Sequence, residues 1–208
     1  MLKPPITGWR FWGGKVQRDH SFSQQNPIFT ASLFFPFQHP EFEDGDNDDT
    51  DCFVTSAELP PATCRRGEHP APDDNCSCGW RMVTDLDELL DYVGYQSSPL
   101  SGWFHLRNYL VISEVRTDQE VCEQVVGDDP PSTLRAATLA ITKLYLGPGY
   151  ARFPRTFERQ FGVPVEVPQP YIVTNGIPGY DFKHWIRQLR EGTTVPLVPL
   201  ETPLPTPR

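Results

Sequence analysis

Four residues in the first half of the chain carry side chains that bind soft metal ions, and they follow one another at short intervals. Four residues separate Cys64 from His69, six separate His69 from Cys76, and one separates Cys76 from Cys78. A structural zinc site needs four such donors arranged tetrahedrally at about 2.0–2.3 Å from the ion. Gly79 follows directly, and a glycine lets the backbone fold back near a metal. The spacing therefore predicts a Zn2+ site formed by Cys64, His69, Cys76 and Cys78.

Other arrangements of these residues are compatible with the sequence. Most zinc motifs place two residues between paired cysteines, whereas one stands here, and Cys52 could replace His69 to give a four-cysteine site. The thiols could also be reduced without a metal, with His69 on the surface, or two of them could form a disulfide. Four protein ligands would make the zinc structural, whereas an open position, with Glu68 or Asp74 as a general base, would suit a zinc-dependent hydrolase.

The elements around these residues predict an α+β fold. Residues 52–81 are irregular and hold four of the five cysteines. Hydrophobic patterning predicts strands at 6–16 (with a glycine turn), 28–37, 109–115 and 119–126, an ambiguous segment at 133–146, and helices after a Thr84 cap, at 155–161 and at 181–190. We expect a small, mostly antiparallel sheet with short helices and a zinc-stapled loop at 52–81.

The domain organisation follows from length and from proline. A chain of 208 residues can bury a real core, and its 23 prolines disfavour long regular elements. We expect one domain over 1–191 and a disordered, proline-rich tail over 192–208, in which residues 196–199 have the Pro-x-x-Pro spacing of a partner ligand. The predicted core contains Trp9, Trp12, Phe34, Phe35, Leu86, Leu89, Leu90, Trp103, Val111, Ile112 and Trp185.

Charge is unevenly distributed. The chain has 27 acidic and 18 basic residues, a net charge of −9, and seven of the acids fall within residues 41–51. Without those seven residues the net charge is close to neutral, which argues against a protein that coats nucleic acid. The acidic run could bind calcium through Asp44, Asp46 and Asp48, but Asp49 stands where an EF-hand loop needs glycine. The alternatives are a solvated loop or a surface that engages a basic partner.

A second charged feature lies near the C-terminus. Lys183, Arg187 and Arg190 are spaced four and three residues apart, so they share one face of the predicted helix at 181–190. An acidic protein could bind there, and a nucleic acid could bind across residues 152–190. The other interpretation is a solvated helix face. We predict that the acidic residues (Asp44, Asp46, Asp48 and Asp49) and the basic residues (Lys183, Arg187 and Arg190) bind a protein partner.

Several motifs, taken in their order, resemble those of a family of small, uncharacterised proteins from actinobacteria and their phages. The motifs are Gly-Trp-Arg-Phe-Trp at 8–12, Cys64, His-Pro-Ala-Pro at 69–72, Cys-Ser-Cys-Gly-Trp at 76–80, Val-Ile-Ser-Glu-Val at 111–115, Arg135-Ala136, Leu144-Tyr145 and Phe-Gly-Val-Pro-Val at 161–165. The resemblance spans about residues 8–165. It bears on fold and compartment more than on function.

The functional expectation is a non-enzymatic, zinc-stabilised binding or adaptor protein that regulates a larger partner. No Gly-x-Ser-x-Gly elbow and no phosphate-binding glycine loop occurs in the sequence. The alternatives are a nucleic-acid accessory factor, such as a recombination or transcription modulator, and the zinc-dependent hydrolase. No run approaches the roughly 20 apolar residues of a membrane span, and residues 1–5 lack a secretory h-region, so we expect a cytoplasmic protein.

Overall fold

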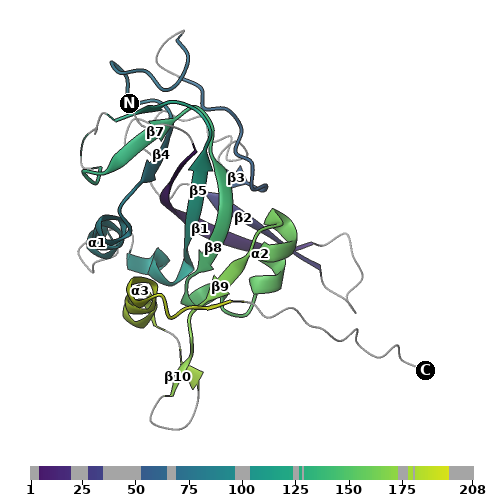
Figure 1. Ribbon diagram of the computed structural model, residues 1–208. Helices are drawn as coiled ribbons and strands as arrows, with labels where there is room; N and C mark the ends of the chain where they lie inside the picture. The colour runs from purple at the N-terminus through teal and green to yellow at the C-terminus, as the bar shows by residue number, and fades with distance from the viewer. Residues whose placement is uncertain are drawn as a thin grey trace.

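A large mixed sheet forms the centre of the computed structural model (Figure 1). The structure describes residues 5–19, 28–34, 53–64, 69–96, 104–123, 127, 129–172, 178–179 and 181–196. The strands are β1 (Ile6–Asp19), β2 (Ile28–Phe34), β3 (Phe53–Val54), β4 (Trp80–Val83), β5 (Leu110–Thr117), β6 (Val121–Cys122), β7 (Thr133–Ala136), β8 (Ala140–Leu146), β9 (Val165–Val167), β10 (Tyr171–Ile172), β11 (Pro178–Gly179) and β12 (Val195–Pro196). The helices are α1 (Leu86–Gln96), α2 (Pro154–Phe161) and α3 (Phe182–Glu191), with short 3-10 helices η3 (Phe104–Tyr109) and η4 (Pro148–Tyr150).

The order of the strands confirms the predicted α+β class. The main path through the sheet is β12-β9-β8-β5-β1-β4-β7-β6, while β2 pairs with β1 and β3, and β10 and β11 form a separate small sheet. Among the described pairs, β8 and β9 run parallel and the others are antiparallel. Segments far apart in the chain pair directly, because β4 lies beside β7 and β5 beside β8.

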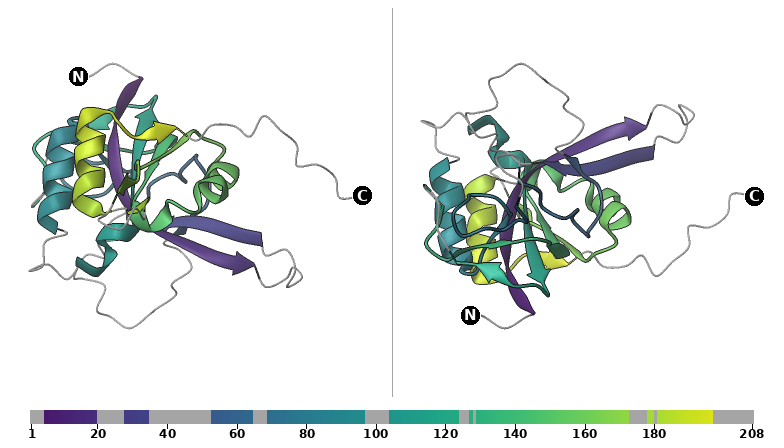
Figure 2. Two further views of the ribbon diagram at one scale, coloured as in Figure 1. Left: turned by 90° about the horizontal axis from the view of Figure 1, so that it is seen from below. Right: turned by 90° about the horizontal axis from the view of Figure 1, so that it is seen from above.

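The helices cover the two faces of the sheet in separate groups. Helices α1 and α3 lie side by side over one face, and α2 lies on the other side (Figures 1 and 2). Strand β5 is apolar on both faces for this reason. Ile112 packs in the cluster under α1 and α3, whereas Val111 and Val115 pack in the cluster that contains Phe157 of α2. Burial on both faces explains why this strand is a nearly continuous apolar run.

Most of the predicted core residues that the structure describes are buried. Trp9 and Leu86 are half-buried and pack against the cluster under α1 and α3. The side chain of Phe34 and the whole of Phe35 and Trp103 lie outside the described residues. The fully or nearly fully buried members of the prediction are Trp12, Leu89, Leu90, Val111, Ile112 and Trp185.

The glycine turn predicted within residues 6–16 is wrong, because β1 continues without interruption to Asp19. Gly14 is required by packing. A Cβ atom there would lie 2.5 Å from Cε2 of Tyr150, whose hydroxyl donates a hydrogen bond to the Gly14 carbonyl. Beyond this point β1 and β2 continue as a two-stranded arm that extends from the body (Figure 2).

The helix ends follow capping rules with one correction. The predicted cap Thr84 instead donates its hydroxyl to the carbonyl of Ser132, and Asp85 caps α1 by accepting from the amides of Asp87 and Glu88. Aspartate is a strong N-cap because its carboxylate satisfies amides that lack helical partners.

The segments predicted at 133–146 and at 192–208 both contain strands. The ambiguous stretch contains two strands, β7 and β8. Strand β12, near the start of the predicted tail, pairs with β9, and residues 197–208 lie outside the described residues. No helix within the described ranges is long and apolar enough to cross a membrane.

Candidate metal centre

The four predicted metal ligands come together in the structure. One donor atom from each of Cys64, His69, Cys76 and Cys78 lies within 4.8 Å of the donors of the other three. The sulfurs of Cys64 and Cys76 are 3.5 Å apart, and Nδ1 of His69 is 4.0 Å from the sulfur of Cys78. A tetrahedral zinc ion with ordinary bond lengths separates two sulfurs by about 3.8 Å and a sulfur from a nitrogen by about 3.5 Å. These two separations lie within about 0.5 Å of the values for zinc, so the cluster can hold a metal ion.

The described cysteines form no disulfide in this structure. A disulfide joins its sulfurs at about 2.0 Å, well below the separation of Cys64 and Cys76. Cys64, Cys76, Cys78 and Cys122 all carry thiols that are not in disulfides. Cys52, the alternative fourth ligand, lies outside the described residues.

We call residues 55–79, of which 55–64 and 69–79 are described, the cysteine loop. Its first half is held to the sheet by backbone hydrogen bonds from the amides of Leu59 and Ala62 to the carbonyls of Leu139 and Ala137. The indole of Trp80 adds a hydrogen bond to the carbonyl of Pro60 at 2.7 Å. These bonds fix the approach of the chain to Cys64.

The second half of the cysteine loop makes a turn that places two of the ligands. The Asp73 side chain accepts a hydrogen bond from the amide of Asn75, and its carbonyl accepts one from the amide of Cys76. Gly79 has a φ of +109°, a conformation that residues with a Cβ rarely adopt, and a Cβ there would lie 3.0 Å from Pro72. The glycine therefore lets the chain turn directly from Cys78 into β4, as the sequence predicts.

A buried arginine holds the backbone of this turn through hydrogen bonds. Arg135 of β7 is fully buried, and its guanidinium donates hydrogen bonds to the carbonyls of Cys76, Cys78 and Asp73. Guanidinium has five donors in a rigid plane, so one side chain can satisfy several carbonyls that would otherwise be buried without partners. Arg135 thus links the backbone of two metal ligands to the sheet.

Sequence reasoning does not assign this role to Arg135. In the sequence, Arg135 stands out only as part of the Arg135-Ala136 motif. The local signal is a charged residue between Leu134 and Ala136 in a strand whose residues are all buried. A buried charge needs partners, so such a residue indicates a polar contact that the strand alone cannot supply.

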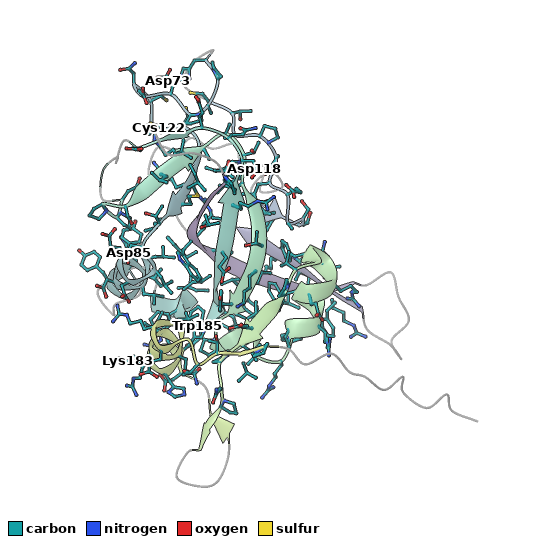
Figure 3. All side chains as sticks on the ribbon, in the orientation of Figure 1. Asp73, Asp85, Asp118, Cys122, Lys183 and Trp185 are labelled. Atoms are coloured by element: carbon teal, nitrogen blue, oxygen red, sulfur yellow. The ribbon has the colours of Figure 1, made fainter. Side chains whose placement is uncertain are left out.

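Cys122 lies beside this arginine and outside the metal cluster. Its thiol donates to the carboxylate of Asp74 at 3.0 Å and accepts from the guanidinium of Arg135 at 2.8 Å. It is buried, as expected for a small core residue, but it is also hydrogen-bonded. Asp73 and Cys122 lie near one another at the same end of the molecule (Figure 3).

The surroundings of the ligands shift their pKa values in different directions. The backbone amide of Cys78 and the Cys64 thiol lower the pKa of the Cys76 thiol to about 7. Burial raises the pKa of the Cys78 thiol to about 11. The carbonyl of Pro70, which accepts a hydrogen bond from the ring, raises the pKa of His69. A bound cation favours the deprotonated form of every ligand, so metal binding and proton release are coupled here.

The other predicted site residues are exposed, ion-paired or outside the described residues. Lys183 and Arg187 are exposed on α3, and Lys183 points away from the side of the helix on which Trp185 is buried (Figure 3). Arg190 instead makes ion pairs with Asp87 and Asp91 of α1. The predicted acidic residues Asp44, Asp46, Asp48 and Asp49 lie outside the described residues.

The hydrolase alternative names two candidate bases, Asp74 and Glu68. Asp74 is hydrogen-bonded to Cys122, and Glu68 lies outside the described residues.

Comparison with known proteins gives no match to a family model, to a curated protein or to a solved structure. The resemblance to the actinobacterial and phage family therefore remains a prediction.

Proposed function

We propose that the chain is a zinc-stabilised binding protein that regulates a larger protein partner and does not use its metal for catalysis. The observation that carries the proposal is the convergence of four protein donors, Cys64, His69, Cys76 and Cys78, all within 4.8 Å of one another. Four protein ligands complete the coordination of zinc and leave no position for a reactive water. A filled coordination shell disfavours the zinc hydrolase.

Zinc is the proposed ion because of the donor set. Thiolate and imidazole ligands select zinc over hard cations such as Mg2+ and Ca2+, which prefer oxygen. The three thiolates must stay reduced, which fits the proposed cytoplasmic location. The proposal includes membership of the actinobacterial and phage family, because Cys64, the 69–72 and 76–80 motifs and Arg135 all meet at this centre.

The proposed partner-binding surface is the outer face of α3. Lys183 and Arg187 are both exposed there, while Arg190 makes ion pairs with Asp87 and Asp91 of α1. A rigid helix that presents two cations fits an acidic protein surface. Charge pairs at the rim of an interface act mainly on the association rate and on salt dependence.

The test of the zinc proposal is elemental analysis of protein purified without added zinc. We expect one zinc per chain, and its loss in Cys76→Ser and Cys78→Ser variants that keep the secondary structure of the wild type. A stoichiometric zinc content in both variants would contradict the ligand assignment.

The test of the partner surface is affinity capture from host lysate with full-length bait at moderate salt. We expect a stoichiometric partner that Lys183→Glu/Arg187→Glu bait no longer retains. Lys15→Glu bait is the control, because Lys15 is exposed on the β1–β2 arm, away from α3. A partner that both altered baits retain equally would contradict the assignment of α3.

A second candidate function is supported by a separate group of arginines. Arg152 and Arg159 are exposed at α2, and Arg159 donates a hydrogen bond to the carbonyl of Phe29 in β2. Arg18 is paired with Phe29 across the β1–β2 arm, so Arg18 and Arg159 both lie beside Phe29. Such a group fits the nucleic-acid accessory factor, since clustered cations bind phosphates.

Gel-shift titration across a salt series tests this second function. We expect weak binding that falls steeply with salt and is lost in Arg152→Glu/Arg159→Glu, because counterion release dominates such complexes. Absence of binding at low salt would remove nucleic acid as a partner.

A further inference from the structure

The described cysteines have two kinds of surroundings. Cys64, Cys76 and Cys78 are half-buried, so solvent reaches the metal cluster. Cys122 is 7% exposed and has hydrogen bonds to Asp74 and Arg135. A small oxidant can therefore reach the cluster thiols far more easily than the thiol behind them.

One pair within the cluster is arranged for disulfide formation. Cys64 and Cys76 belong to different segments of the cysteine loop, and their sulfurs are 3.5 Å apart. Bond formation requires them to approach by about 1.5 Å. Cys76 and Cys78 are separated by one residue, so a disulfide between them would close a small, strained ring. Arg135 also fixes the carbonyls of both these residues, which opposes that rearrangement.

We propose that Cys64 and Cys76 form an oxidation site for hydrogen peroxide, and that formation of their disulfide releases the metal. This inference rests on the proposed zinc site. One thiolate attacks a peroxide oxygen, the O–O bond breaks, and the sulfur becomes a sulfenic acid while hydroxide leaves. The second thiolate attacks that sulfur, the S–S bond forms, and a second hydroxide leaves. Two thiolates are oxidised by two electrons, the peroxide is reduced to two waters, and two protons are consumed.

Zinc loss follows from the change in ligands. After oxidation only Cys78 and His69 can still donate to the ion, and a disulfide sulfur is a poor ligand because thiolate is the form that binds zinc. The backbone of Cys76 and Cys78 stays attached to Arg135, because that guanidinium bonds to carbonyls and not to the sulfurs of the cluster. The ion is therefore released from a loop that is still fixed to β7, so reduction can restore the site.

The experiment is a hydrogen peroxide titration of the zinc-loaded, full-length protein. Zinc release is followed with a chromogenic chelator, thiols are counted, and disulfides are mapped by peptide mass spectrometry. We expect loss of one zinc and two thiols per chain, a peptide pair joining Cys64 to Cys76, and recovery of zinc binding after reduction. Cys122→Ser is the matched control and should release zinc at the wild-type rate.

Three results would overturn the inference. They are retention of zinc in excess peroxide, release that accompanies a Cys76–Cys78 disulfide or irreversible sulfur acids, and release that depends on Cys122. Cys64→Ser provides a second measurement, since Cys76 should then stop at the sulfenic acid, which dimedone traps. Protein that binds no zinc before peroxide is added would refute the zinc proposal itself, so the two failures are distinguishable.

Discussion

The centre of the sheet and the cysteine loop are stabilised in different ways. At the centre, β5 and β8 bury apolar residues on both faces, and Val111, Leu144 and Leu146 have no exposed surface. The described part of the cysteine loop buries only two hydrophobic side chains, Leu59 and Ala71. The loop therefore cannot recover its conformational entropy through apolar burial and needs another source of stability.

That source is polar and is concentrated at one point. Hydrogen bonds from the guanidinium of Arg135 hold the backbone of the loop, and the proposed metal ion would add coordination by the four donors. The centre instead relies on contacts spread over many side chains. Packing at the centre joins many elements, whereas the cluster holds one loop. Damage at the cluster should therefore stay local, while damage at the centre should reach the whole molecule.

Removal of a central tryptophan should have the largest effect. Trp12 is fully buried, donates to the hydroxyl of Ser113 and lies 4.5 Å from the guanidinium of Arg10. We expect Trp12→Ala to lower the free energy of unfolding by about 3–5 kcal/mol, since large-to-small changes lose burial and leave a cavity. Urea denaturation measures this. Tyr95→Ala is the control, because Tyr95 is 76% exposed and should change stability little.

Loss of the buried arginine should affect both regions. Arg135→Met removes the donors for the carbonyls of Cys76, Cys78 and Asp73. We expect a loss of about 2–4 kcal/mol, because buried acceptors without partners are costly. We also expect zinc affinity about 10–100-fold weaker, as for other residues that hold metal ligands in place. Competition with a zinc chelator measures the affinity, and an unchanged value would separate Arg135 from the metal site.

Chelation of zinc should have a smaller, local effect. We expect amide hydrogen exchange to increase over residues 69–79 after zinc is removed, while the amides of β5 and β8 keep their protection. The reason is that the buried clusters around β5 and β8 contain no metal ligand. Exchange mapped by mass spectrometry before and after chelation checks this. Equal deprotection of the loop and of β5 would mean that the ion holds the entire fold together.

The sequence predicts the features that depend on local spacing. The intervals between Cys64, His69, Cys76 and Cys78 identify the cluster, because ligands to one ion are close in the chain. Apolar periodicity identifies α3, whose cap Asp181 accepts a hydrogen bond from the amide of His184. These signals need only a few consecutive residues, so no knowledge of the tertiary structure is required.

The features that the sequence does not predict depend on distant residues. Gly14 is next to a glycine and resembles a turn, but Tyr150 from η4 determines its environment. Arg135 becomes a support for the metal site only because β7 pairs with β4 and β6, which brings it under Cys78. The cap shifts from Thr84 to Asp85 because Ser132 accepts the Thr84 hydroxyl. In each case a tertiary contact decides between local alternatives.

The contact between α1 and α3 should give the smallest effect and tests whether charge or packing joins the helices. Arg190 pairs with Asp87 at 3.3 Å and also with Asp91, but these aspartates are 74% and 75% exposed. Exposed ion pairs contribute little, so we expect Arg190→Ala to lower stability by less than about 1 kcal/mol, with a smaller difference at high salt. Trp185, which is fully buried beneath α3, supplies the main attachment of the helix by packing. Urea denaturation at low and high salt measures both quantities, and a loss above about 2 kcal/mol that disappears in salt would show that charge, rather than packing, attaches α3.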